Sequence, residues 1–145
     1  MEPYEIHEHP ADIGLKIRGR TIEDLFRHAA WGFFDLVTDL SVFRRPEAQS
    51  FPEAHYDFNL EAAGRPDLMH VWLRELVYVF SAKRYVLVDF SFLELDETTL
   101  RGHGTGRIFD PRRHEPKLEV KAVTHHCFSL EQRGDHWEVQ VIFDV

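Results

Sequence analysis

The sequence predicts an α+β protein built as a two-layer sandwich, in which a largely antiparallel sheet carries two helices on one face. Two segments place hydrophobic residues at three- and four-residue steps, as amphipathic helices do. Other segments alternate apolar and polar residues, and the last four of them follow one another through short turns, which favours antiparallel pairing. We expect the element order β-β-α-β-α-β-β-β-β in a single domain, residues 1–145.

The chain is expected to begin with two strands. Residues 4–8 alternate and are interrupted at Pro10, which indicates a short edge strand. The next strand is expected over 14–18. The apolar side chains from Ile13 onward share one face, so Asp12 belongs to the solvated face.

Two helices should follow, with a strand between them. Thr21 is a typical N-cap, and the segment 22–37 carries an apolar stripe facing one side. The proline-containing segment 38–52 predicts a loop, and the alternation over 56–60 predicts a strand. A second apolar stripe over 68–80 predicts the second helix.

The remainder of the sequence predicts a β-meander. Its four expected strands are 85–95, 98–107, 117–130 and 136–144. Gly102, Gly104 and Gly106 resemble a phosphate-binding loop but do not precede a helix. Glycines at every second position of a strand indicate close backbone approach or a bulge instead.

Composition narrows the classes of function. The 25 acidic residues outweigh 17 Lys and Arg, giving a formal charge of −8, and such a surface disfavours strong direct binding to nucleic acid. The single cysteine, Cys127, excludes an internal disulfide and a multi-thiolate zinc site. No segment has the length and apolar character of a membrane span, and no export signal starts the chain, so we expect a cytoplasmic protein without a membrane partner.

Two aspartates at opposite ends of the sequence suggest an ion site. In the last strand the apolar residues share one face, which leaves Asp144 on the uncovered face. Asp12 lies on the uncovered face of its own strand in the same way. If the two strands lie together, both carboxylates and the terminal carboxylate of Val145 form a hard oxygen cluster suited to calcium or magnesium. Spacing alone nevertheless favours two surface aspartates at frayed chain ends.

Other candidate residues suggest a second reading of the same region. Lys121 could pair with a carboxylate across the sheet or hold an anionic ligand. A metal-dependent phosphoester hydrolase is therefore an alternative, in which Asp12 and Asp144 hold an ion that activates water while Lys121 or His125 handles protons. No nucleophile elbow and no paired-cysteine motif supports an enzyme.

Several blocks of the sequence together resemble the archease family, in the expected order and over nearly the whole chain. The blocks are His9-Pro10-Ala11-Asp12-Ile13-Gly14, Thr21-Ile22-Glu23-Asp24-Leu25-Phe26, Phe34-Asp35-Leu36-Val37-Thr38-Asp39, Glu119-Val120-Lys121-Ala122-Val123-Thr124-His125-His126 and Val141-Ile142-Phe143-Asp144-Val145. Two positions depart from the family pattern: Pro10 stands where Ser or Thr is usual, and His125 where Tyr is common.

The resemblance implies a non-enzymatic, chaperone-like helper in tRNA processing, without catalytic residues. Its expected partner is the tRNA-splicing RNA ligase that joins a 3′-phosphate or 2′,3′-cyclic phosphate end to a 5′-hydroxyl end, whose nucleotidylation and turnover it promotes and whose use of GTP it widens towards ATP. A tRNA methyltransferase is an alternative partner. The resemblance also implies a divalent cation held by Asp12, Asp144 and Val145, calcium first, with magnesium or manganese as alternatives, and it keeps Lys121 as a secondary functional candidate.

Overall fold

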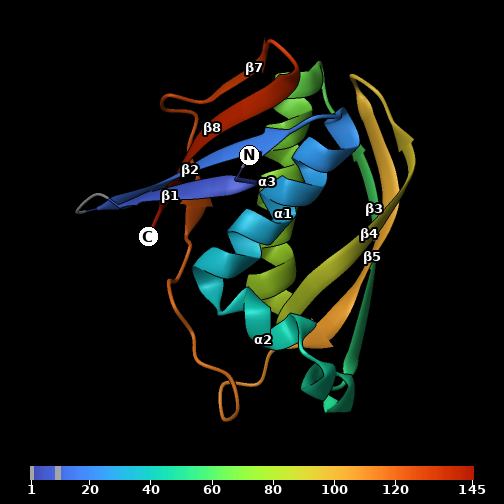
Figure 1. The fold of residues 1–145 in the computed structure, drawn as a ribbon, viewed down its shortest axis with the longest axis vertical. Helices are drawn as coiled ribbons and strands as arrows, with labels where there is room; N and C mark the ends of the chain where they lie inside the picture. The colour runs from blue at the N-terminus through green and yellow to red at the C-terminus, as the bar shows by residue number, and fades with distance from the viewer. Residues whose placement is uncertain (1, 9–10) are drawn as a thin grey trace.

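Two long helices lie between two antiparallel sheets in a computed structural model that describes residues 2–8 and 11–145 (Figure 1). The helices are α1 (Ile22–Val37) and α3 (Arg65–Lys83). Helix α1 contacts strands of both sheets and also contacts α3, so the helices form the central layer. This arrangement buries each helix on more than one side.

The first sheet brings together the two ends of the chain. Its strands are β1 (Tyr4–Glu8), β2 (Asp12–Gly19), β6 (Ala122–Val123), β7 (Ser129–Arg133) and β8 (His136–Asp144). Strand β8 pairs with β2 on one side and with β6 and β7 on the other, while β1 forms the edge beside β2. All of these pairs are antiparallel.

The second sheet contains the middle of the chain in the order β3 (Glu53–Glu61), β5 (Thr99–Ile108) and β4 (Tyr85–Leu95). Strand β4 is bulged against β5 at two places. A Cβ atom added to Gly102 would lie 2.5 Å from the carbonyl oxygen of Ser91, and one added to Gly106 would collide with that of Val86. The prediction of close backbone approach is thus confirmed at Gly102 and Gly106, whereas Gly104 lies against side chains.

The structure confirms the expected N-cap of the first helix, but part of the segment expected to be a loop is helical. The hydroxyl of Thr21 accepts a hydrogen bond from the amide of Asp24 at 3.1 Å, which confirms it as the N-cap of α1. The segment predicted as a loop over 38–52 contains the short helix α2 (Leu40–Arg44) and the 3₁₀ helix η1 (Pro46–Ser50).

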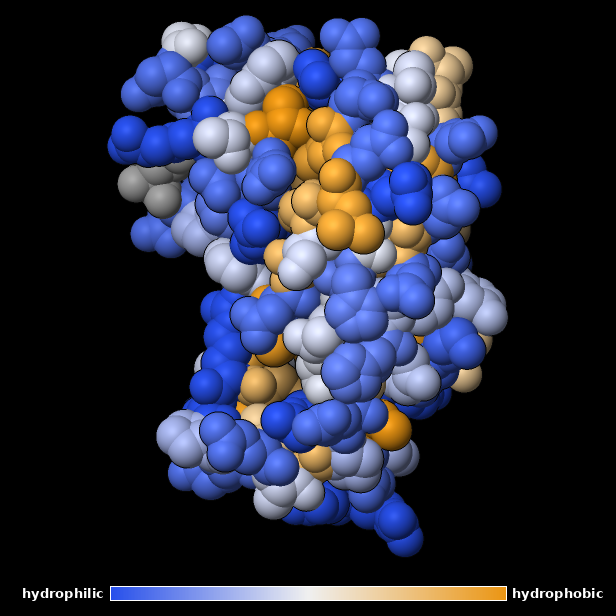
Figure 2. Space-filling model, turned by 90° about the vertical axis from the view of Figure 1, so that its right-hand side faces the viewer, coloured by the Kyte–Doolittle hydropathy of each residue, from blue (hydrophilic) through white to orange (hydrophobic). Residues whose placement is uncertain are grey.

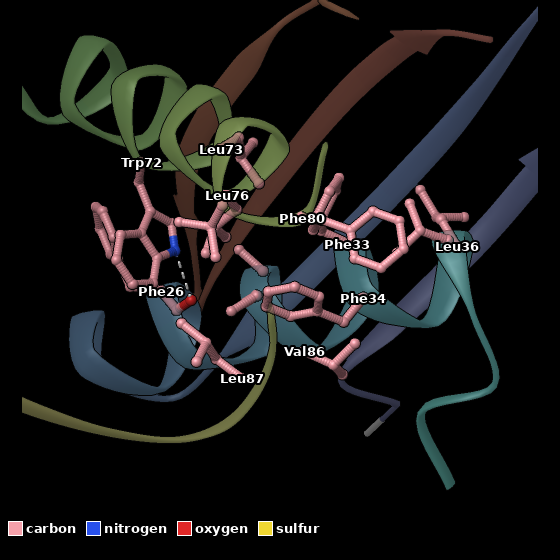
Figure 3. Packing of buried hydrophobic residues seen from close by; sticks show 14 of the residues in the cluster. Phe26, Phe33, Phe34, Leu36, Trp72, Leu73, Leu76, Phe80, Val86 and Leu87 are labelled. Atoms are coloured by element: carbon pink, nitrogen blue, oxygen red, sulfur yellow. Dashed lines mark hydrogen bonds between the residues drawn. The ribbon is translucent and has the colours of Figure 1, made fainter. Parts of the chain in front are cut away.

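Aromatic side chains join the helices within the core. The indole Nε1–H of Trp72 on α3 donates to the carbonyl of Phe26 on α1 at 2.9 Å (Figure 3), so a buried polar group is satisfied where the two helices meet. Phe26 and Phe58 pack against the same indole. Trp72 therefore ties α1, α3 and the three-stranded sheet together.

The α+β class and the antiparallel pairing are confirmed, but the strands are divided between two sheets instead of forming the single expected sheet. The physical reason lies in α1, whose neighbouring residues Phe33 and Phe34 are both buried, as are Ala29 and Ala30. A helix that is apolar over so much of its circumference needs a cover on both sides.

The predicted strand 117–130 was wrong as one continuous element. Strand β6 lies inside this segment, and β7 begins near its end at Ser129. The amides of Lys117 and Leu118 instead donate to the carbonyls of Val37 and Leu36 at the end of α1, at 2.9 and 3.0 Å. This segment satisfies the free carbonyls of a helix end, a role that alternation in the sequence does not reveal.

Among the described residues, no helix is both long enough and apolar enough to cross a membrane.

Candidate functional site

Asp12 and Asp144 lie directly opposite each other at the end of the β2–β8 pair. Their neighbours Ile13 and Phe143 are buried towards the helices, so by strand alternation both aspartates project from the outer face of the five-stranded sheet. Side chains at such opposed positions have Cβ atoms about 4.5–5.5 Å apart. The fold thus brings together two carboxylates separated by almost the whole sequence.

These two carboxylates lack a compensating charge within the described residues. One carboxylate oxygen of Asp12, Oδ1, is shielded from solvent and has no hydrogen-bond partner there. Neither aspartate takes part in any ion pair found among residues 2–8 and 11–145. Like charges placed opposite each other on a sheet repel, and a buried carboxylate oxygen without a donor is costly. A cation would relieve both penalties.

The backbone around Asp144 is fixed from both sides. Strand β2 pairs with it on one side, and on the other the amide of Lys121 donates to its carbonyl at 2.8 Å while Ala122 lies opposite it in β6. Val145, which follows, is half-buried and packs against the core. The sheet therefore sets the position of Asp144, and the side chain of Val145 is held against the core.

Lys121 is placed beside the acidic pair by that backbone bond. Its side chain is exposed, and its ammonium group belongs to none of the ion pairs among the described residues. The structure therefore brings Lys121 next to Asp144 in the backbone without committing its charge to a partner.

A shallow groove of about 540 Å³ lies on the same outer face. It is lined by the edge strand β1 at His7, by Lys16 of β2 and Gln140 of β8, and by Cys127 of the β6–β7 connection. Gly14 and Ile142, the opposed residues one step in from Asp12 and Asp144 on this face, also line it. The acidic pair therefore lies next to a surface that can receive part of another molecule.

No group of three or more His, Cys, Asp or Glu side chains suited to a metal occurs in residues 2–8 and 11–145. The candidate centre consists of two side-chain carboxylates, and its third oxygen donor would be the terminal carboxylate of Val145. Metal binding by Asp12, Asp144 and Val145 stays a prediction.

A second charged cluster on this sheet was missed by the sequence analysis. Glu138 is buried on the outer face of β8, where it pairs with Arg18 at 3.3 Å, with Arg133 at 3.3 Å and with Lys16 at 3.8 Å. Glu138 lies opposite Arg18 in the β2–β8 register. The sequence places both residues on the polar side of their strands. It does not give the register, which sets them opposite each other.

The family model of the archease protein family (MTH1598/TM1083) matches residues 4–145. The chain belongs to the archease family. It is 31% identical to protein archease of Pyrococcus furiosus, with 100% of both chains covered, and 32% identical to protein archease of Methanopyrus kandleri, with 99% of each covered.

Two solved structures have the archease fold seen here. The solution structure of protein 1598 of Methanobacterium thermoautotrophicum superposes with a TM-score of 0.74 at 26% identity, over 100% of both chains. A crystal structure from Thermotoga maritima, described as "an archease, possible chaperone", has a TM-score of 0.64 at 23% identity, over 96% of this chain and 94% of that one, and supports the fold alone.

One of the blocks that carry the archease resemblance has a structural explanation in Asp35. Its carboxylate accepts hydrogen bonds from the hydroxyl of Tyr4 at 2.8 Å and from the amide of Leu40 at 3.1 Å, and it lies 3.6 Å from the ammonium group of Lys117. Burial and the neighbouring Asp35 carboxylate raise the pKa of Tyr4, so its hydroxyl stays a donor. Asp35 therefore joins β1, α1 and α2.

Of the two positions that depart from the family pattern, the structure describes His125 but not Pro10. His125 stacks face to face on His70 of α3, with ring centroids 3.7 Å apart and planes 8° from parallel, so it supplies a flat ring there. Burial, and secondarily the nearby His125, lower the pKa of His70. His126 is exposed. Pro10 and His9 lie outside the described residues.

Proposed function

We propose that this archease-family protein is a non-catalytic, chaperone-like activator of the RNA ligase that joins 3′-phosphate and 5′-hydroxyl ends during tRNA processing. In this role it promotes nucleotidylation of the ligase and its repeated turnover, and it widens the use of GTP towards ATP. Family membership supports the role. The proposed place of action is the cytoplasm.

The observation that carries the proposal is the opposed pair of Asp12 and Asp144 with its unpartnered buried oxygen. We propose that these carboxylates and the α-carboxylate of Val145 hold a divalent cation, calcium in the first place and magnesium or manganese as alternatives. Hard oxygen donors carrying negative charge fit such an ion, and the Lys121 amide keeps Asp144 in place to provide one of them. When bound, the ion would supply positive charge on an otherwise acidic surface.

Charge also supports a protein partner over RNA itself. The formal charge of −8 disfavours strong direct nucleic-acid binding, whereas a ligase that handles RNA and nucleotide presents a basic surface. Complementary fields accelerate association between two such proteins. The groove beside the acidic pair, with Lys16 in its lining, is the proposed contact surface.

The test is a single-turnover nucleotidylation assay of the matching ligase, with and without this protein, in GTP and in ATP. Asp144→Ala should abolish the stimulation without unfolding the domain, because the residue is exposed. Glu97→Ala removes one negative charge from the exposed β4–β5 turn and should stimulate as the wild type does. Equal stimulation by Asp144→Ala would exclude the acidic pair from the function.

A direct ion measurement tests the centre separately. Calcium at 100 times its dissociation constant should stabilise the wild type by about 2.7 kcal/mol, and Asp144→Asn should lose this effect. A single glycine added after Val145 moves the terminal carboxylate and should also weaken calcium binding. Unchanged calcium binding in both variants would contradict the proposed ligands.

The same protein preparations also test the two alternative functions. Turnover of phosphoesters by the isolated protein, lost on chelation, would replace the helper role with that of a metal-dependent hydrolase. Recovery of a tRNA methyltransferase in place of the ligase by a tagged copy of the protein would change the partner.

A further inference from the structure

The outer face of the three-stranded sheet carries a chain of four side chains that the proposed function does not use. His55 on β3 and His103 on β5 face each other, with Nδ1 of His55 3.3 Å from Nε2 of His103. Nδ1 of His103 lies 2.6 Å from a carboxylate oxygen of Asp57, and Nε2 of His55 lies 3.3 Å from one of Glu53. Each imidazole thus has a carboxylate behind it and the other imidazole in front.

Hydrogen bonding fixes where the protons of these rings lie. An ionised carboxylate accepts only, so the ring nitrogens facing Asp57 and Glu53 carry the protons. A neutral imidazole has one proton, and the two nitrogens that face each other are then both bare. Two lone pairs 3.3 Å apart repel each other unless a cation lies between them.

We propose that His55 and His103 form a binding site for a transition-metal ion that prefers imidazole, such as zinc. Nitrogen ligands lie about 2.0–2.1 Å from zinc, and two of them in a tetrahedral arrangement are therefore about 3.3–3.4 Å apart, which matches the observed separation. Asp57 and Glu53 serve as the outer carboxylates that orient metal-bound histidines.

The site is open to water, which sets its strength and its coordination. The side chains of His55 and His103 are 57% and 39% exposed, and this side of the molecule is mostly hydrophilic (Figure 2). Two imidazoles are the inner ligands, and water or a donor from another molecule completes the shell. The ligand type separates it from the Asp12 and Asp144 pair, whose hard oxygens prefer calcium.

The experiment is calorimetric titration of Zn²⁺ into the full chain carrying Asp144→Ala, so that the acidic pair does not contribute. One zinc ion per chain should bind, and His55→Gln or His103→Gln should each weaken binding at least about tenfold. His126→Gln, which removes an exposed histidine elsewhere, should bind zinc like its parent. This readout is independent of the ligase assay.

A positioning variant and a spectroscopic readout complete the test. Asp57→Asn keeps both imidazoles and should weaken zinc binding by about 10–100-fold. Nitrogen-15 NMR should show the Nδ1 signal of His55 and the Nε2 signal of His103 shifting together as zinc is added. Zinc affinity that is equal in the histidine variants, or a wild type whose two rings share only a proton and take up no zinc, would overturn the proposal.

Discussion

The two ends of the β2–β8 strand pair treat acidic residues in opposite ways. At one end Glu138 is only 8% exposed, yet Arg18, Lys16, Arg133 and His136 all lie within 3.8 Å of its carboxylate. At the other end two carboxylates face each other, and one of their oxygens is buried without a partner in the described part of the chain.

The difference separates a structural acid from a candidate ligand. The sheet supplies its own cations around Glu138, so that carboxylate stabilises the fold and has no need of an ion. Around Asp12 and Asp144 the same two strands place no lysine or arginine within ion-pair distance among the described residues. A divalent cation bound between these two carboxylates would offset the repulsion that no neighbouring side chain neutralises.

The largest expected effect comes from breaking the neutralised end. Glu138→Gln should lower the free energy of unfolding by about 2 kcal/mol, because three cationic side chains lose a buried partner; the loss is less than for a fully enclosed pair since those side chains are partly solvated. Urea unfolding measures it. Glu131→Gln, an exposed neighbour on β7, should change stability by less than about 0.5 kcal/mol. Equal effects would mean that Glu138 contributes no more than a surface charge.

The same chemical change at the other end should have the opposite sign. In the presence of a chelator, Asp144→Asn should raise the free energy of unfolding by up to about 1 kcal/mol, because it removes a like-charge pair across the strands. Asp89→Asn, at an exposed position of β4, is the matched control and should have no such effect. Destabilisation by Asp144→Asn under chelation would show that the two carboxylates do not repel.

Much of this site could be predicted from sequence because strand alternation is local. The alternation places Asp12 and Asp144 on the solvated faces of their strands, and the resemblance to archease brings the two strands together. What alternation cannot provide is register: a shift of one residue would move either aspartate to the buried face. The burial of Asp12 Oδ1 depends on that register and on the neighbouring strand.

Two features could not be predicted from the sequence, the pairing of His55 with His103 and the division of the strands into two sheets. The two histidines are 48 positions apart, and neither has a sequence neighbour at metal-ligand spacing. The division into two sheets depends on how much of α1 is buried, which a single apolar stripe does not disclose. Both features arise from tertiary packing of segments that each look ordinary alone.

The smallest expected effect concerns Glu5, a partly exposed acid that also pairs with Arg18, at 2.6 Å. The hydrogen bond from Arg18, and then its charge, lower the pKa of Glu5 below its ordinary value of 4.5. The folded protein therefore releases this proton more readily than the unfolded chain does. The resulting stability is present above pH 4.5 and is lost as the pH falls through the lower pKa of the folded state.

Glu5→Gln should accordingly reduce the free energy of unfolding near neutral pH and leave it unchanged at the acidic end of the titration, where Glu5 of the wild type is protonated as well. Urea unfolding of both proteins across the acidic range measures the difference, and carbon-13 NMR of the Glu5 carboxyl group gives its pKa directly. A constant difference at every pH would assign the effect to packing, and Arg18 would then be held by Glu138 alone.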